Sequence, residues 1–233
     1  QAREVDGALV LTHVSPDGDE GFPGALEVRV TYSLTADGVL MLDYWAKSDA
    51  DTLCNLTNHS YFNLLGHDAG TLAGQQVEIF ADAITQTDEN STPTGALLPV
   101  EGTPFDLRRP RDFLEGLAMD HPQLALGNGY DHNFVLHTAP ISPLSLAARV
   151  SGGGLVLECL TTQPGLQLYT ANYLDGTPGK GGTAYGPRSA FCLETQNWPD
   201  AVHHASFPSP VLRAGEVYRH RTVYRVGMCP PLP

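Results

Sequence analysis

A strict alternation of apolar and polar residues over positions 26–34 limits the folds that this chain can adopt. The apolar set falls on one side of an extended backbone and the polar set on the other, which predicts a half-buried strand. Asp37-Gly38 follows as a strong hairpin signal, and residues 39–46 are predicted to return antiparallel to the first strand. The chain therefore starts an antiparallel sheet with one buried face.

Further strands are predicted along most of the chain, at residues 8–13, 53–65, 76–80, 144–150, 155–161, 162–174, 190–194 and 216–226. Residues 82–109 contain turn after turn and are expected to form a long excursion over the surface. Residues 110–119, which start with a proline, are the only predicted helix. About ten strands against one short helix favour an all-β fold, a large antiparallel β-sandwich, over an α/β fold.

Size and composition agree with one domain spanning residues 1–233. The 233 residues are 42% hydrophobic and only 17% charged, so the chain can bury a sizeable core. A formal net charge of −13 opposes binding to phosphate backbones and to anionic membranes, and no apolar run approaches the length of a membrane span. Neither nucleic acid nor a membrane is expected as a partner.

The four cysteines, Cys54, Cys159, Cys192 and Cys229, lack paired metal-type spacing, and three of them sit inside apolar runs. A reduced thiol in such a run packs as a small hydrophobe. We expect a reducing compartment, the cytoplasm.

Polar side chains interrupt apolar strands in four segments: 58–63, 129–133, 163–167 and 194–200. Burying such groups without partners costs on the order of 2 kcal/mol each. One shared polar cavity would explain all four. The alternative is that the polar groups satisfy one another at sheet edges and in turns, and that Glu194 merely ends a strand.

Within these segments, an imidazole and a carboxylate offer an acid and a base that can move protons at neutral pH. The neighbouring amide and aromatic side chains are typical of sites that hold sugar hydroxyls and rings. No Gly-x-Ser-x-Gly is present, which disfavours a serine hydrolase. A metal site built from His59, His132, His203, His204 and Glu194 is disfavoured, because the adjacent His203 and His204 fall on opposite faces of any strand.

The four segments, read at residues 58–64, 129–134, 162–167 and 194–201, closely resemble the aldose 1-epimerases, also called galactose mutarotases. Supporting matches at residues 15–24, 93–95, 103–108, 172–176 and 212–216 run in the family's order. The resemblance implies a mutarotase-like supersandwich without a metal or organic cofactor. It implies an isomerase that interconverts the α and β anomers of free hexoses such as galactose and glucose.

Carried over by motif, Glu194 is the expected base for the anomeric hydroxyl and His59 the expected acid for the ring oxygen. Asp131 and Gln167 are the expected ligands of sugar hydroxyls. The other expected substrate-binding residues are Asn58, Ser60, Tyr61 and Trp198, of which Tyr61 and Trp198 are our own additions as walls of the pocket. We expect Glu194 and His59 to face each other across a hexose-sized hollow, and His132 to be a structural neighbour.

One departure from the family pattern leaves alternatives open. Family members carry an arginine and a His-Gly-Gly motif ahead of the segment that matches Ala8, and this chain has neither. Relative to the family the domain is therefore expected to be N-terminally incomplete, either as a fragment or through a real loss. The rival hypothesis is a catalytically weak sugar-binding or regulatory protein, expected like the enzyme to be a monomer or weak homodimer. An epimerase for phosphorylated hexoses ranks last, because the four segments contain no Lys or Arg.

Overall fold

The computed structural model describes residues 1–137 and 144–228, so Cys229 lies outside the described residues. The larger of its two main sheets contains nine strands, in the sheet order β1 (Ala2–Val5), β2 (Ala8–Ser15), β3 (Leu26–Leu34), β4 (Val39–Ser48), β19 (Val217–Met228), β13 (Leu155–Thr161), β12 (Ser145–Gly152), β7 (Gln76–Ile79) and β10 (Arg111–Asp112). The second sheet contains six strands, in the order β6 (Tyr61–Phe62), β17 (Phe191–Gln196), β14 (Gly165–Tyr169), β11 (Asp131–Leu136), β8 (Ala81–Thr87) and β9 (Pro93–Pro99).

Smaller elements lie between the strands of these sheets along the chain. Two short ribbons pair β5 (Thr52–Leu53) with β18 (Val211–Leu212), and β15 (Thr177–Pro178) with β16 (Ala184–Tyr185). The helices are α1 (Phe113–Leu117), α2 (Pro122–Leu126) and the 3₁₀ turns η1 (Asp19–Gly21), η2 (Lys180–Gly182) and η3 (Ala201–His203). Within the described ranges, no helix is long and apolar enough to cross a membrane.

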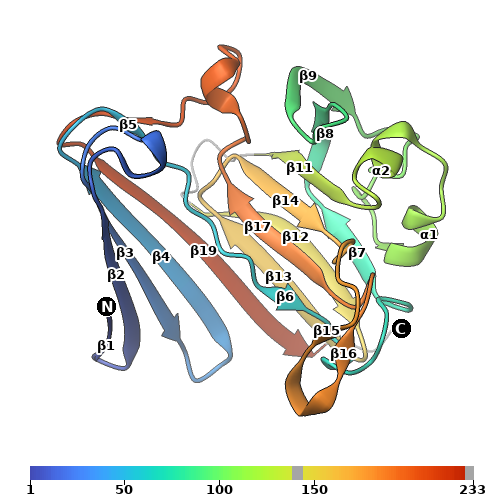
Figure 1. Ribbon diagram of the computed structural model, residues 1–233. Coiled ribbons are helices and arrows are strands. Elements are labelled where there is room, and N and C mark those ends of the chain that lie inside the picture. Colours follow the sequence, from blue (N-terminus) through green and yellow to red (C-terminus); the bar gives the residue numbers. More distant parts are fainter. Residues whose placement is uncertain (138–143, 229–233) are drawn as a thin grey trace.

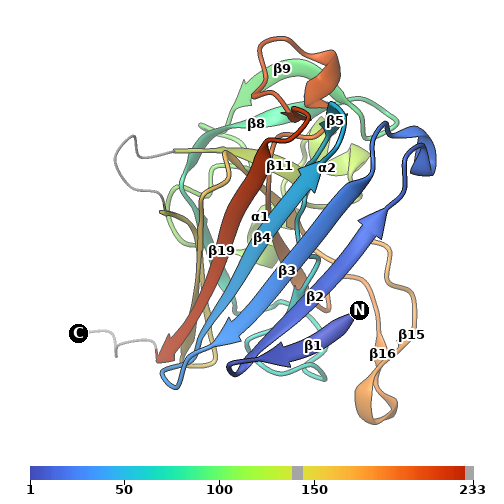
Figure 2. The ribbon, with the colours of Figure 1, turned by 90° about the vertical axis from the view of Figure 1, so that its left-hand side faces the viewer.

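The predicted antiparallel β-sandwich is confirmed. The six-stranded sheet lies over the part of the large sheet formed by β19, β13, β12 and β7, while β1, β2 and β3 extend beyond it (Figures 1 and 2). The main core cluster contains Leu157 and Tyr224 from the large sheet and Leu168 and Leu193 from the smaller one. By contrast, Val10 is the only buried residue in β1, β2 and β3. The core therefore fills the space between the two sheets.

The hairpin predicted at Asp37-Gly38 is present. β3 and β4 pair from Leu34 opposite Leu40 to Leu26 opposite Ser48, and Gly38 in the turn has a φ of +80°. A glycine adopts this left-handed conformation without steric cost. β4 then pairs with β19, the last strand, which joins the start of the described chain to its end.

Three expectations about local structure are wrong. The segment 82–109 contains most of β8 and all of β9, which form one end of the six-stranded sheet. The segment 53–65 is mostly irregular and contains only the last residue of β5 and the two-residue β6. Residues 110–119 contain β10 before α1, and α2 is a second helix that the sequence reading missed.

Candidate functional site

The side chains of β17 alternate between two faces of the small sheet. One face packs into the core, and the other carries candidate site residues. Leu193 belongs to the main core, and the Thr195 hydroxyl lies 2.6 Å from the Thr222 hydroxyl of β19. Cys192, Glu194 and Gln196 share the other face of the strand. Glu194 and Gln196 are thus presented on the side of the small sheet that faces away from the core.

The register of the small sheet places these residues in two neighbouring rows. In one row, Glu194 lies opposite Gln167 of β14, which in turn lies opposite Asn133 of β11. In the other row, Cys192 of β17 lies between Tyr61 of β6 and Tyr169 of β14, and Tyr169 lies opposite Asp131 of β11. Directly opposed residues share a face and their side chains touch.

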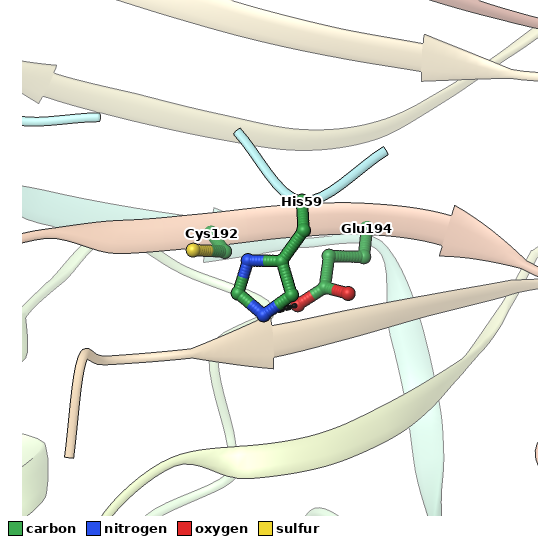
Figure 3. Close-up of side chains that lie close together, drawn as sticks. All are labelled: His59, Cys192 and Glu194. Carbon is green, nitrogen blue, oxygen red and sulfur yellow. Dashed lines mark ion pairs between the residues drawn. The ribbon is translucent and has the colours of Figure 1, made fainter. Parts of the chain in front are cut away.

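His59 joins this face from the irregular segment between β5 and β6. Its ring stacks on Tyr61 at a centroid distance of 4.9 Å and meets the edge of Tyr169 at 5.7 Å. Its Nε2 lies 3.4 Å from Oε1 of Glu194 (Figure 3). The His59 side chain is 49% exposed and that of Glu194 is 10% exposed, so the imidazole lies on the solvent side of the pair.

Asn58 holds the chain in place directly before His59. Its Nδ2 donates to the Tyr44 hydroxyl at 3.0 Å, and its Oδ1 accepts from the Tyr224 hydroxyl at 3.2 Å. Both tyrosines belong to strands of the large sheet, and all three side chains are buried. The irregular segment is therefore tied to the large sheet, and His59 is left to project over the small one.

Burial shifts the protonation of the site carboxyls. It raises the pKa of Glu194 to about 7, with a further contribution from the negative charge of Asp131. Burial also raises the pKa of Asp131, against the opposing effects of a hydrogen bond from Gln167 and of the nearby His59. The Glu194 carboxyl can therefore gain and lose a proton close to neutral pH.

Hydrogen-bonded side chains of Asp131, Asn133, Gln167 and Gln196 form the floor of the site. Gln167 donates through Nε2 to Oδ1 of Asp131 at 2.8 Å, and its own Oε1 accepts from Nε2 of Gln196 at 3.3 Å. Gln196 also donates to Oδ1 of Asn133 at 3.4 Å. These bonds fix which oxygens and amide hydrogens of the floor remain free for a ligand.

The structure brings together five of the eight residues expected at the site, namely His59, Glu194, Asp131, Gln167 and Tyr61. Ser60 is half-buried between His59 and Tyr61 in the chain. Trp198 lies over Gly165 in β14, where a Cβ would come within 2.9 Å of its Cδ1, and its Nε1 donates to the Pro164 carbonyl at 3.1 Å.

The remaining expected ligand, Asn58, lies inside the sandwich on its two tyrosines and does not face the other members of the set. His132 points to the opposite face of β11 from Asp131, where it is fully buried against Phe105. Burial lowers the pKa of His132 to about 4. Its position agrees with the structural role expected for it.

The expected hollow between Glu194 and His59 is wrong as stated, because the two side chains are in direct contact at 3.4 Å. Any ligand of both side chains therefore has to lie across the pair and not between its members. Two nearby residues were missed from the sequence, Tyr169 and Cys192. Each stands two positions from an expected residue of the same strand, so the period of two would have found both.

A metal ion was not expected here, yet one group of side chains has suitable ligand atoms. Sγ of Cys192, a carboxylate oxygen of Glu194 and a ring nitrogen of His59 lie within 4.8 Å of one another. Thiolate, imidazole and carboxylate are the ligands that zinc uses in proteins.

Comparison with known proteins places the chain in a family. The family model described as aldose 1-epimerase matches residues 1–225. The chain is 46% identical over 221 residues to the galactose mutarotase of Sus scrofa, covering 94% of this chain and 63% of that protein. It is 37% identical over 224 residues to the aldose 1-epimerase of Escherichia coli, covering 94% of this chain and 64% of that protein. The chain thus spans less than two thirds of the length of these relatives.

Solved structures agree with the sequence comparison. An aldose epimerase homologue from C. elegans superposes with a TM-score of 0.87 at 29% identity, covering 98% of this chain and 68% of that one. A galactose 1-epimerase from Lactobacillus acidophilus gives a TM-score of 0.83 at 27% identity, covering 98% of this chain and 65% of that one. With the family model matching nearly the whole described chain, these likenesses establish that the chain belongs to the aldose 1-epimerase family.

Proposed function

We propose that this protein is an aldose 1-epimerase that interconverts the α and β anomers of free hexoses through Glu194 and His59. The observation that carries the proposal is the contact of 3.4 Å between the Glu194 carboxylate and the His59 imidazole. The anomeric oxygen and the ring oxygen of a hexose are bonded to the same carbon. An acid and a base that lie side by side are therefore spaced to reach both oxygens at once.

In this mechanism, the Glu194 carboxylate takes the proton of the anomeric hydroxyl while the His59 imidazolium gives a proton to the ring oxygen. The bond between C1 and the ring oxygen breaks, which leaves an open-chain aldehyde and a C5 hydroxyl. Rotation about the C1–C2 bond exposes the other face of the aldehyde. Ring closure then returns both protons to the groups that they came from, so the protein ends the cycle unchanged.

Free hexoses already interconvert slowly in water, and general acid and general base catalysis each contribute roughly a hundredfold or more. The pKa of about 7 for Glu194 supports its role as the base, because the carboxylate is then a stronger base than an exposed one and is still formed near neutral pH. The rate requires ionised Glu194 together with protonated His59. A bell-shaped dependence of the rate on pH is therefore expected.

The floor of the site supports binding of hexose hydroxyls. Asp131 and Gln167 present acceptor and donor atoms beside Glu194. The Tyr61 ring, 48% exposed as a residue, offers an apolar surface beside His59, and Trp198 bounds the same face over Gly165. We assign Ser60 to the rim of the site and take Asn58 out of the set of sugar ligands.

Polarimetry on freshly dissolved α-D-glucose and α-D-galactose tests the proposal. The protein should accelerate the approach to anomeric equilibrium, and Glu194→Gln and His59→Ala should each reduce the rate by a hundredfold or more. Asp200→Asn is a matched control, since Asp200 pairs with His203 and His204 and not with this site. Galactose binding without any acceleration would favour the rival, a sugar-binding protein without catalysis.

We also propose a cytoplasmic location and a monomer or weak homodimer. Three buried free thiols, Cys54, Cys159 and Cys192, support a reducing compartment. A single chain supplies both members of the acid–base pair, so catalysis as proposed does not require a second subunit. Sedimentation over a range of protein concentrations tests the assembly, and a stable higher oligomer would contradict it.

A further inference from the structure

Cys192 has no part in the chemistry proposed above, yet it stands at the centre of the site. It precedes Glu194 by two residues on the same face of β17, and its side chain lies close to those of His59 and Glu194 (Figure 3). Its partners across the sheet are Tyr61 of β6 and Tyr169 of β14. Its side chain is fully buried. A thiol this close to an imidazole and a carboxylate completes a set of three zinc-type ligands.

The charges around Cys192 also favour a cation. The negative charges of Glu194 and Asp131 add to burial in raising the pKa of the Cys192 thiol. The charge of Asp131 also helps to raise the pKa of Glu194. Three acidic groups in a partly buried site disfavour one another's ionisation. A divalent cation removes this conflict, because its two positive charges compensate a thiolate and a carboxylate that would otherwise be buried as anions.

We propose that the protein binds a thiophilic divalent cation, Zn²⁺ foremost, through His59, Cys192 and Glu194, and that the bound ion switches off the acid–base pair. On binding, the S–H bond of Cys192 breaks, its proton passes to solvent, and a metal–sulfur bond forms. A lone pair of the imidazole and an oxygen of the Glu194 carboxylate complete three positions. Water takes the fourth.

The required movement is small. Zinc bonds of about 2.3 Å to sulfur and about 2.0–2.1 Å to nitrogen in a tetrahedron place those ligand atoms about 3.5 Å apart. The three ligand atoms here lie within 4.8 Å of one another, so they approach by roughly 1 Å. His59 is the member that can move, because it stands on an irregular segment and is half exposed, whereas Cys192 and Glu194 are fixed within β17.

Bound metal would occupy the Glu194 oxygen that is proposed to accept a proton and the His59 nitrogen that is proposed to donate one. Inhibition therefore rests on the proposed function, whereas metal binding does not. Hard cations such as Mg²⁺ and Ca²⁺ prefer oxygen ligands, so they should neither bind here nor inhibit.

Cobalt is the probe for binding, because Co²⁺ adopts zinc geometries and shows a charge-transfer absorption when a thiolate is a ligand. One Co²⁺ per chain should give this absorption in the whole protein, and Zn²⁺ should abolish it by displacement. Cys192→Ala should lose the absorption and bind Zn²⁺ at least tenfold more weakly by calorimetry. Cys54→Ala is the matched control, since Cys54 is also a buried free thiol but lies in a separate cluster with Ala46 and Leu212.

Activity gives the second readout. Cys192→Ala should no longer be inhibited by Zn²⁺, with the rate of each protein compared with its own metal-free rate, whereas the unchanged protein should lose its rate as Zn²⁺ is added. His59→Ala provides an independent binding variant and should also weaken Zn²⁺ binding at least tenfold.

The two proposals fail separately. Absence of the thiolate absorption, or equal Zn²⁺ affinity in the whole protein and in Cys192→Ala, would overturn the metal site. Absence of mutarotation in metal-free protein that still binds Co²⁺ through Cys192 would overturn the proposed function and leave the metal site standing.

Discussion

The Glu194 carboxyl lies where burial and a neighbouring negative charge oppose its ionisation. Its pKa of about 7 in the folded protein is above the ordinary value of 4.5. The folded state therefore binds more protons than the unfolded state between these values. The stability associated with the protonated carboxyl is present below about pH 4.5 and is lost as the pH rises through about 7. At higher pH the ionised group costs roughly 3 kcal/mol.

We therefore predict that Glu194→Gln makes the protein more stable at pH 8.5, by up to roughly 3 kcal/mol, while it removes catalysis. At pH 5 the gain should fall below roughly 1 kcal/mol. Urea unfolding at the two pH values measures both numbers. Glu158→Gln is the matched control with the opposite sign, because ion pairs with Arg149 and Arg225 lower the pKa of Glu158. A gain of equal size at both pH values would contradict the prediction.

The negative charge of Asp131, in the neighbouring row of the small sheet, contributes to the raised pKa of Glu194. Asp131→Asn removes a negative charge that helps to raise the pKa of Glu194, so that pKa should fall. The acidic limb of the profile of kcat/KM against pH should move to lower pH. The maximal rate should fall roughly 10- to 100-fold, since Asp131 is the charged hydrogen-bond partner proposed for the sugar.

Polarimetry between pH 4 and pH 9 measures this limb. Asp82→Asn serves as the control, because Asp82 pairs with Arg108 and His137 on an exposed surface and should leave the limb unchanged. An acidic limb that stays in place in Asp131→Asn, or moves to higher pH, would count against the role assigned to Glu194.

At the scale of single elements, β11 carries one titrating group on each face. Asp131 faces the site, whereas His132 faces the core, and burial lowers the pKa of His132 to about 4. This value is below the ordinary 6.5, so the unfolded state binds the extra proton first as the pH falls. His132 therefore lowers stability as the pH falls from about 6.5 to about 4, opposite to the effect of Glu194.

Between pH 7 and pH 4 the protein is expected to lose stability because of His132. We predict that His132→Asn makes this loss smaller by up to roughly 3 kcal/mol. Chemical unfolding of the protein and the variant across this range gives the comparison. His13→Asn, which changes an exposed histidine, should leave the pH dependence of stability as it is. If both variants behaved alike, buried His132 would not be the source of acid sensitivity.

The elements that the sequence predicts well are those with a local cause. β3, β4 and the turn between them follow from alternation and from a glycine with positive φ. β9 was missed because Pro93, Gly95 and Pro99 suggest a loop, yet β9 ends its sheet, where a strand tolerates proline. The irregular segment before β6 was read as a strand because its polar anchors, such as Asn58 on Tyr44, are long-range contacts.

Some residues of the candidate site can likewise be predicted from local sequence, and others cannot. The motifs identify His59 and Glu194, and alternation places Cys192 beside Glu194 on one face of β17. That Tyr169 and Asp131 lie in the row of Cys192 depends on the register of β17, β14 and β11. These strands come from distant parts of the chain, so their register follows from packing that a single sequence does not display.

For the whole molecule, the net charge of −13 leads to a prediction about the substrate. A neutral hexose is not attracted or repelled over long distances, whereas a phosphorylated hexose is repelled by an acidic protein. The value of kcat/KM for galactose should therefore change less than twofold between about 10 mM and 500 mM salt. A rate for galactose 6-phosphate that rises steeply with salt and exceeds that for galactose would instead favour the epimerase for phosphorylated sugars.

The two faces of β17 also tie the evolution of the site to that of the fold. One added or deleted residue within positions 191–196 would exchange the two faces, sending Glu194 toward the interior and Leu193 toward the candidate site. Point substitutions can change the chemistry of this strand, but changes of length cannot. We expect natural variation in length to accumulate in the surrounding loops and to spare these six positions.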